Sequence, residues 1–70
     1  MKDSGYARPK KQSIGMFGVA PTCEIVFYPQ QKWKYEIRFS SVYLKNEKNH
    51  INIHAGLDWF NENFKEVDNE

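Results

Sequence analysis

The sequence predicts a small α+β domain, in which a curved antiparallel sheet of three or four strands is packed by one C-terminal amphipathic helix. Two observations support this prediction. Apolar and polar side chains alternate strictly along residues 33–40, as they do in a strand with one buried face. After position 56 the apolar residues instead recur every three or four positions, which is the spacing of a helix.

Length and composition limit how such a domain can be stabilised. Seventy residues form at most one domain, and a chain of this size buries only about 60% of its extended surface. Its single cysteine, Cys23, rules out a disulfide within the chain. Two Trp, four Tyr and five Phe are the expected source of core stability, and self-association is the second.

The strands are expected in a definite order along the chain. Residues 14–20 are apolar but contain two glycines, which suits a short edge strand. Residues 23–28 are rich in β-branched and aromatic side chains, and a PQQ turn joins them to residues 33–40 as a hairpin. A turn or bulge near Ser40 then shifts the alternation, and residues 50–54 form the last strand.

The remaining segments complete the expected domain, which covers residues 14–67. Residues 1–13 show no apolar period and predict a flexible basic arm, and residues 68–70 predict a disordered acidic tail. Residues 57–67 predict the helix, with one apolar stripe about 80° wide. The expected packing places Leu57, Phe60 and Phe64 of the helix on Trp33, Tyr35, Ile37 and Phe39 of the sheet.

Charge is distributed unevenly, although the net charge is only +1. Residues 1–12 carry four cations and one carboxylate, and residues 32–48 carry five cations and two carboxylates. Residues 55–70 carry one cation and five carboxylates. The middle of the chain therefore suits a polyanionic partner, whereas the C-terminal end suits a basic one.

No catalytic residue, metal-ligand set or cofactor is expected. The sequence lacks a nucleophile elbow, a phosphate-binding loop and an HExxH helix, so we do not expect an enzyme. His50 and His54 bracket a predicted strand, where about 13 Å would separate them, too far to share one ion. The start of the chain has no long apolar run, which predicts no signal peptide, no membrane partner and a cytoplasmic location, at a nucleoid or in a host cytosol.

The polar row of residues 33–40 is the main candidate for a binding surface. Lys34 and Arg38 would lie about 13 Å apart, which suits phosphates about two nucleotides apart along a single strand. Glu36 lies between them and should limit the affinity. Tyr43 is expected to be exposed and to offer a ring on which a base can stack. The expected nucleic-acid contacts are Lys32, Lys34, Arg38, Tyr43, Lys45 and Lys48.

Two other interpretations of the sequence stay open. The alternating charges also suit a solvated face without a ligand. Trp59, in turn, would lie about 200° from Leu57, outside the apolar stripe, and Trp is enriched at protein contacts. A homodimer would use this side, and so would a small inhibitor or adaptor, for example a phage-encoded one, that binds a host protein through its acidic helix. The expected interface residues are Trp59, Glu62, Asn63 and Glu66.

The order of these elements resembles a family of DNA-binding proteins. KYEIRF, a basic loop, the INI strand and GLDWFNENF are similar, over residues 24–66, to the single-strand-binding family of the positive-cofactor-four type and to the related PUR repeats. This resemblance implies a four-stranded sheet with one C-terminal helix, a homodimer paired through its helices, and single-stranded DNA over the basic strands. It places Arg38 at the family's strand arginine and Trp59 one position from its helix tryptophan.

A second resemblance is to the arm-binding domain of tyrosine integrases, on the segment IVFYPQQKWKYEIRF. That family has a three-stranded sheet backed by one helix, and the sheet inserts into the major groove of a duplex. Both resemblances imply a sheet that binds DNA. They differ on single strand against duplex, and on dimer against monomer.

Overall fold

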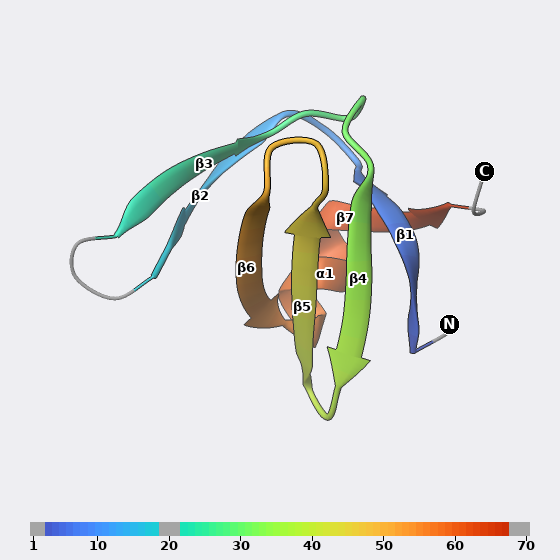
Figure 1. Ribbon diagram of the computed structural model, residues 1–70. Coiled ribbons are helices and arrows are strands. Elements are labelled where there is room, and N and C mark those ends of the chain that lie inside the picture. The colour runs from blue at the N-terminus through green and yellow to red at the C-terminus, as the bar shows by residue number, and fades with distance from the viewer. Residues whose placement is uncertain (1–2, 19–21, 68–70) are drawn as a thin grey trace.

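The computed structural model describes residues 3–18 and 22–67, which form two antiparallel sheets and one helix. In chain order they are β1 (Ser4–Pro9), β2 (Ser13–Phe17), β3 (Cys23–Phe27), β4 (Trp33–Arg38), β5 (Ser41–Asn46), β6 (Ile51–Gly56), α1 (Leu57–Asn63) and β7 (Phe64–Val67). Five strands form an antiparallel sheet in the order β6-β5-β4-β1-β7, and β2 and β3 form a separate ribbon (Figure 1). The helix packs on the larger sheet. The antiparallel α+β architecture is confirmed. The strands form a five-stranded sheet and a two-stranded ribbon rather than one sheet of three or four, and β1, β5 and β7 lie in segments where no strand was expected.

The ribbon shows that the expected hairpin between residues 23–28 and 33–40 is wrong. β3 pairs with β2, whereas β4 pairs with β1 and β5. The turn between β3 and β4 is present, because Gln31 N–H donates to the carbonyl of Tyr28 at 3.0 Å. It carries the chain from one sheet to the other. A local turn signal cannot distinguish these outcomes, since the partner strands lie elsewhere in the chain.

The N-terminal segment corrects a second expectation, a flexible arm over residues 1–13. Its residues 4–9 form β1, which pairs with β4 on one side and with β7 on the other. The inward positions of β1 hold only Gly5, Ala7 and Pro9, so no large apolar side chain marks the period. A search for hydrophobic alternation therefore cannot detect this strand.

The helix is shorter than expected, since α1 ends at Asn63 rather than at residue 67. Phe64 already has extended angles, φ −124° and ψ 155°, and begins β7 along the edge of β1. Lys10 N–H donates to the carbonyl of Asn63 at 2.8 Å, which extends the β1–β7 ladder to the end of the helix. Phe64 is still only 3% exposed, which explains why its spacing fitted a helical stripe. The expected acidic tail, residues 68–70, lies outside the described residues.

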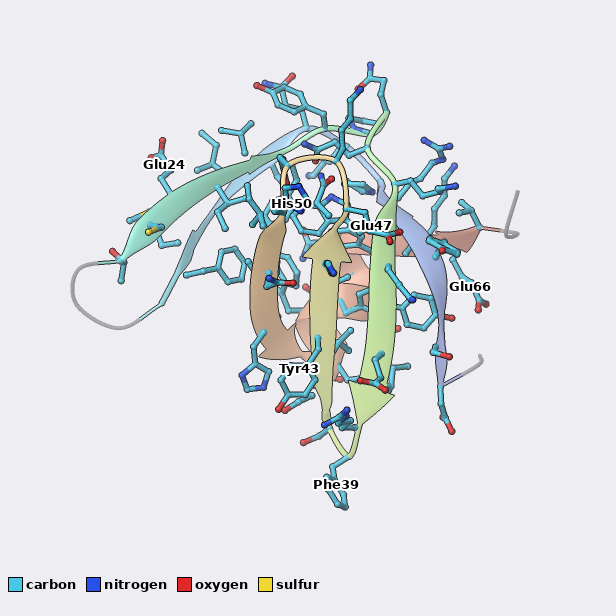
Figure 2. All side chains as sticks on the ribbon, in the orientation of Figure 1. Glu24, Phe39, Tyr43, Glu47, His50 and Glu66 are labelled. Carbon is cyan, nitrogen blue, oxygen red and sulfur yellow. The ribbon has the colours of Figure 1, made fainter. Side chains whose placement is uncertain are left out.

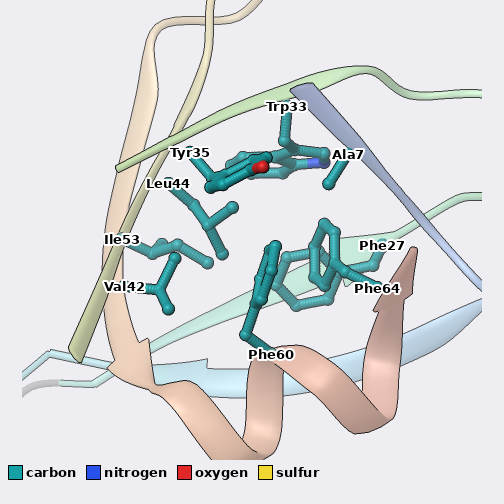
Figure 3. Close-up of a cluster of buried hydrophobic side chains, with 9 residues drawn as sticks. All are labelled: Ala7, Phe27, Trp33, Tyr35, Val42, Leu44, Ile53, Phe60 and Phe64. Carbon is teal, nitrogen blue, oxygen red and sulfur yellow. The ribbon is translucent and has the colours of Figure 1, made fainter. Parts of the chain in front are cut away.

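An aromatic core fills the space between the sheet, the helix and the ribbon (Figure 3). The ring centroid of Phe60 lies 5.2 Å from that of Tyr35, and the centroid of Phe64 lies 6.3 Å from that of Trp33. Phe27 of the ribbon lies 5.5 Å from Trp33 and 5.6 Å from Phe64. The buried apolar side chains are Ala7, Phe27, Trp33, Tyr35, Val42, Leu44, Ile53, Phe60 and Phe64.

Phe39 was expected in this core, and that expectation is wrong. Its relative exposure is 102%, because β4 ends one residue earlier. Arg38 pairs with Ser41, so Phe39 and Ser40 form a two-residue turn between β4 and β5. The alternating pattern therefore continues one residue beyond the strand, where side-chain direction no longer follows the pleat.

Besides Phe27, the ribbon contacts the rest of the fold through the ring of Phe17. This ring makes edge contacts with Phe27 and Trp59, at centroid distances of 5.7 Å and 5.5 Å. Gly15 lies beneath the same ring. A Cβ atom at Gly15 would lie 2.5 Å from Cε2 of Phe17, so any larger residue displaces the ring.

Gly15→Ala is expected to lower the free energy of unfolding by about 1–3 kcal/mol, because the Phe17 ring must leave its two aromatic contacts. Gly56→Ala is the matched control, since a Cβ at Gly56 meets nothing within 4 Å and its φ of −73° is ordinary for alanine. We expect it to change the free energy by at most about 1 kcal/mol. Urea unfolding measures both, and equal losses would contradict this account of Gly15.

The hydroxyl of Tyr35 joins the centre of the sheet to its edge. Tyr35 is buried, and its hydroxyl donates to Oε2 of Glu66 on β7. Burial raises the pKa of Tyr35 to about 12, and the hydrogen bond and negative charge of Glu66 act in the same direction. The folded protein therefore holds this proton beyond the ordinary tyrosine pKa of 10.0.

Stability is expected to fall as the pH rises from about 10 to about 12. Below this window the hydroxyl is protonated in both states, and the full stability is present. Within it the unfolded chain releases the proton first, which lowers the free energy of unfolding by about 2–3 kcal/mol. Tyr35→Phe should remove this component. Urea unfolding at about pH 9 and about pH 12 tests it, and an equal alkaline loss in both proteins would contradict it.

Candidate nucleic-acid interface

The larger sheet has an outer face, which lies opposite the aromatic core. Alternation along β4 places Lys34, Glu36 and Arg38 on this face, and all three are exposed. The pairing registers extend the face to the neighbouring strands. We define the outer face as Ser4, Tyr6, Arg8, Lys32, Lys34, Glu36, Arg38, Ser41, Tyr43, Lys45, Asn52, His54 and Lys65.

Cations on the outer face stand directly opposite one another. Lys34 of β4 pairs with Lys45 of β5, and Arg8 of β1 pairs with Lys65 of β7. Directly opposed like charges destabilise an antiparallel pair. The outer face as defined carries six cations and one carboxylate, Glu36, so positive charge predominates on it.

Glu36 partly neutralises this surface. Its Oε1 lies 2.9 Å from Nη2 of Arg38, and both side chains are more than half exposed. An exposed pair of this kind contributes little to stability. Glu36 therefore mainly lowers the positive charge of the outer face beside the Arg38 guanidinium.

Tyr43 is exposed, at 43%, and lies within a row of π and cationic groups. The Tyr43 and His54 rings stack at a centroid distance of 4.6 Å, with 5° between their planes. Cζ of Arg38 lies 5.5 Å from the centroid of Tyr43. Since β6 and β4 flank β5 on opposite sides, the two neighbours approach Tyr43 from opposite sides.

The basic surface continues to the end of the sheet at the β5–β6 turn. Lys32 extends over the ring of Tyr6, with Nζ 4.8 Å from its centroid. Arg8, Lys32 and Lys48 line one hollow at this end, together with Glu47. The structure thus brings the predicted Lys32 and Lys48 together with Arg8, which the sequence had assigned to an arm.

A second hollow crosses the middle of the outer face. It spans β1, β4, β5 and β6, and its outer-face lining is Ser4, Lys34, Glu36, Tyr43, Lys45 and Asn52. Three of the predicted contact residues therefore share one depression. Sequence reasoning missed Tyr6, Arg8, His54 and Lys65 on the same face, because only the strand register places them beside the predicted residues.

The expected partner interface is not brought together in the same way. Trp59 is half-buried, with its ring 5.5 Å from Phe17 and 5.6 Å from Phe27. Asn63 donates from Nδ2 to the carbonyl of Trp59 at 2.8 Å, and Glu66 accepts from Tyr35. The ribbon therefore covers the flank of the helix at Trp59, which was expected to be available to a partner. Glu62 is exposed, and an interface here stays a prediction.

Over residues 3–18 and 22–67, no group of three or more His, Cys, Asp or Glu side chains could hold a metal ion. The helix found there has neither the length nor the apolar character to cross a membrane. Comparisons of the chain with protein-family models, with curated proteins and with solved structures gave no match.

Lys45→Glu is expected to stabilise the fold by about 0.2–1 kcal/mol at low salt, because it replaces a repulsive cross-strand pair with an attractive one. The gain should shrink as salt screens the pair. Lys11→Glu makes the same change of charge at an exposed position between β1 and β2 and serves as the control. Urea unfolding measures both variants, and equal shifts would show that Lys34 and Lys45 do not repel each other measurably.

Proposed function

We propose that this protein is a non-enzymatic nucleic-acid-binding protein that holds single-stranded DNA on its outer face. The observation that supports this most directly is the strand register, which places Lys34 opposite Lys45 and Arg8 opposite Lys65. Each costs stability in the isolated sheet. A phosphate backbone along these pairs would replace repulsion with attraction and release counterions. Action in the cytoplasm, at a nucleoid or in a host cytosol, fits this ligand.

The width of the outer face favours a single strand over a duplex. Five strands spaced about 4.8 Å apart span about 19 Å, whereas the major groove of DNA is only about 12 Å wide. The whole face is therefore too broad to enter that groove. A single strand can instead lie across it, with phosphates on the cations and bases near the exposed Tyr43.

The cations define a path for such a strand. Lys32 and Lys48 lie at one end of the sheet, Lys34 and Lys45 follow, and Arg38 ends the path at the β4–β5 turn. Along β4 the rise per residue places Lys34 and Arg38 about 13 Å apart, or about two nucleotides. The side chains on this path are expected to contact phosphates rather than specific bases, so little sequence preference follows.

Lys34→Ala combined with Arg38→Ala is expected to weaken binding to a labelled oligothymidine about tenfold or more at low salt. The slope of log K against log salt should fall by about 1.4, since each lost phosphate contact removes about 0.7 for a single strand. Fluorescence anisotropy measures both quantities. Lys10→Ala combined with Lys11→Ala is the control, because Lys10 donates to the carbonyl of Asn61 on the helix side.

Glu36→Gln is expected to change binding in the opposite direction to the Lys34 and Arg38 double variant. It removes the carboxylate 2.9 Å from Arg38 with little change in shape, and we expect binding to become several-fold tighter. If the parent protein does not bind oligothymidine, or if the Lys34 and Arg38 double variant binds as the parent does, the outer face is only a solvated face. An inhibitor or adaptor that uses the acidic helix would then become the leading hypothesis.

A further inference from the structure

Phe39 projects away from the molecule at the tip of the β4–β5 turn (Figure 2). Its relative exposure of 102% means that the phenyl ring gains nothing from burial in the fold. Single exposed apolar residues are common on proteins and need no explanation by themselves. The backbone at Phe39, however, makes this residue unusual.

The backbone of Phe39 has a φ of 57°, in the left-handed region. The first position of a two-residue hairpin turn often requires a positive φ, and glycine is the residue that adopts it at least cost. A bulky aromatic residue at such an angle is a genuine outlier. Phe39 is thus unfavourable for the fold twice, through its exposed ring and through its backbone, and no ring contact with another described residue offsets either cost.

The position of this ring relates it to the outer face. Phe39 directly follows Arg38, the last cation of the path along β4. Tyr43, the other exposed aromatic residue near this end, already has His54 and Arg38 against its ring. Phe39, by contrast, offers both faces of its ring to solvent. A base that continues past Arg38 would meet the free ring next.

We propose that Phe39 is a stacking residue for an unpaired base of a single-stranded nucleic acid whose phosphates lie along Lys34 and Arg38. This inference rests on the proposed function and adds the base contact that the cations alone do not provide. Stacking on an aromatic ring tolerates every base, since each base has a π face. The ligand class is therefore a single strand with accessible bases, with no particular sequence required.

Phe39→Gly is the informative variant, because it removes the ring and also relaxes the turn. We expect binding to oligothymidine to weaken by about 5-fold to about 100-fold, the range typical of one lost base stack. The thermal midpoint should equal or exceed that of the parent, which separates the effect from misfolding. Phe39→Tyr should bind as the parent does. Ile14→Ala removes another exposed apolar side chain, on the ribbon, and should also leave binding unchanged.

An abasic oligonucleotide of the same length tests whether the ring contacts a base. The parent protein and Phe39→Gly are expected to bind it equally, since it offers phosphates without bases. An equal loss on both ligands would overturn the stacking role. If Phe39→Gly binds oligothymidine as the parent does, while the Lys34 and Arg38 double variant does not, the inference fails and the proposed function stands. If the parent binds neither ligand, both fail.

Discussion

The ring contacts of Phe27 join the separate parts of the fold, and the rest of the structure depends on them. From β3 it reaches rings of the ribbon, the sheet, the helix and β7, with centroid distances of 5.5–5.7 Å. Each aromatic pair of this geometry adds about 0.5–1.5 kcal/mol beyond the area it buries. For a chain of 70 residues with a small core, four such pairs at one point are a large share of the stability. The rings around Phe27 are Phe17, Trp33, Trp59 and Phe64.

This core explains why the two faces of the sheet differ so strongly. The helix and the ribbon both contribute to the aromatic core, so that Trp33 and Tyr35 of β4 and Val42 and Leu44 of β5 are almost wholly excluded from water. The opposite face has no part in that packing, and alternation fills it with polar groups. Cations can therefore gather there without interrupting the core. Trp59 is half-buried because its ring contacts Phe17 of the ribbon as well as Phe27 and Phe64 of the core.

Features that cost stability are concentrated on or beside the outer face. Lys34 on β4 lies opposite Lys45 on the adjacent β5. Phe39 exposes its ring from a backbone angle that suits glycine. Costs of this kind persist only where the surrounding structure supports them, and they are frequent at functional sites. Among the residues that the structure describes, no buried side-chain nitrogen or oxygen lacks a hydrogen-bond partner, and the Tyr35 hydroxyl donates to Glu66. This contrast is consistent with the proposed binding surface.

The sequence by itself determined which residues of β4 point inward and where the helix begins, because these features depend on local periods of two and of 3.6 residues. It also placed Lys34, Arg38 and Tyr43 on one exposed face. Only the tertiary structure decided the partners of each strand, since β1 pairs with β7 across almost the whole chain. For the same reason it alone ended the helix at Asn63 and brought Arg8 to the basic surface. Pairing over such distances depends on the shared core and leaves no local pattern to detect.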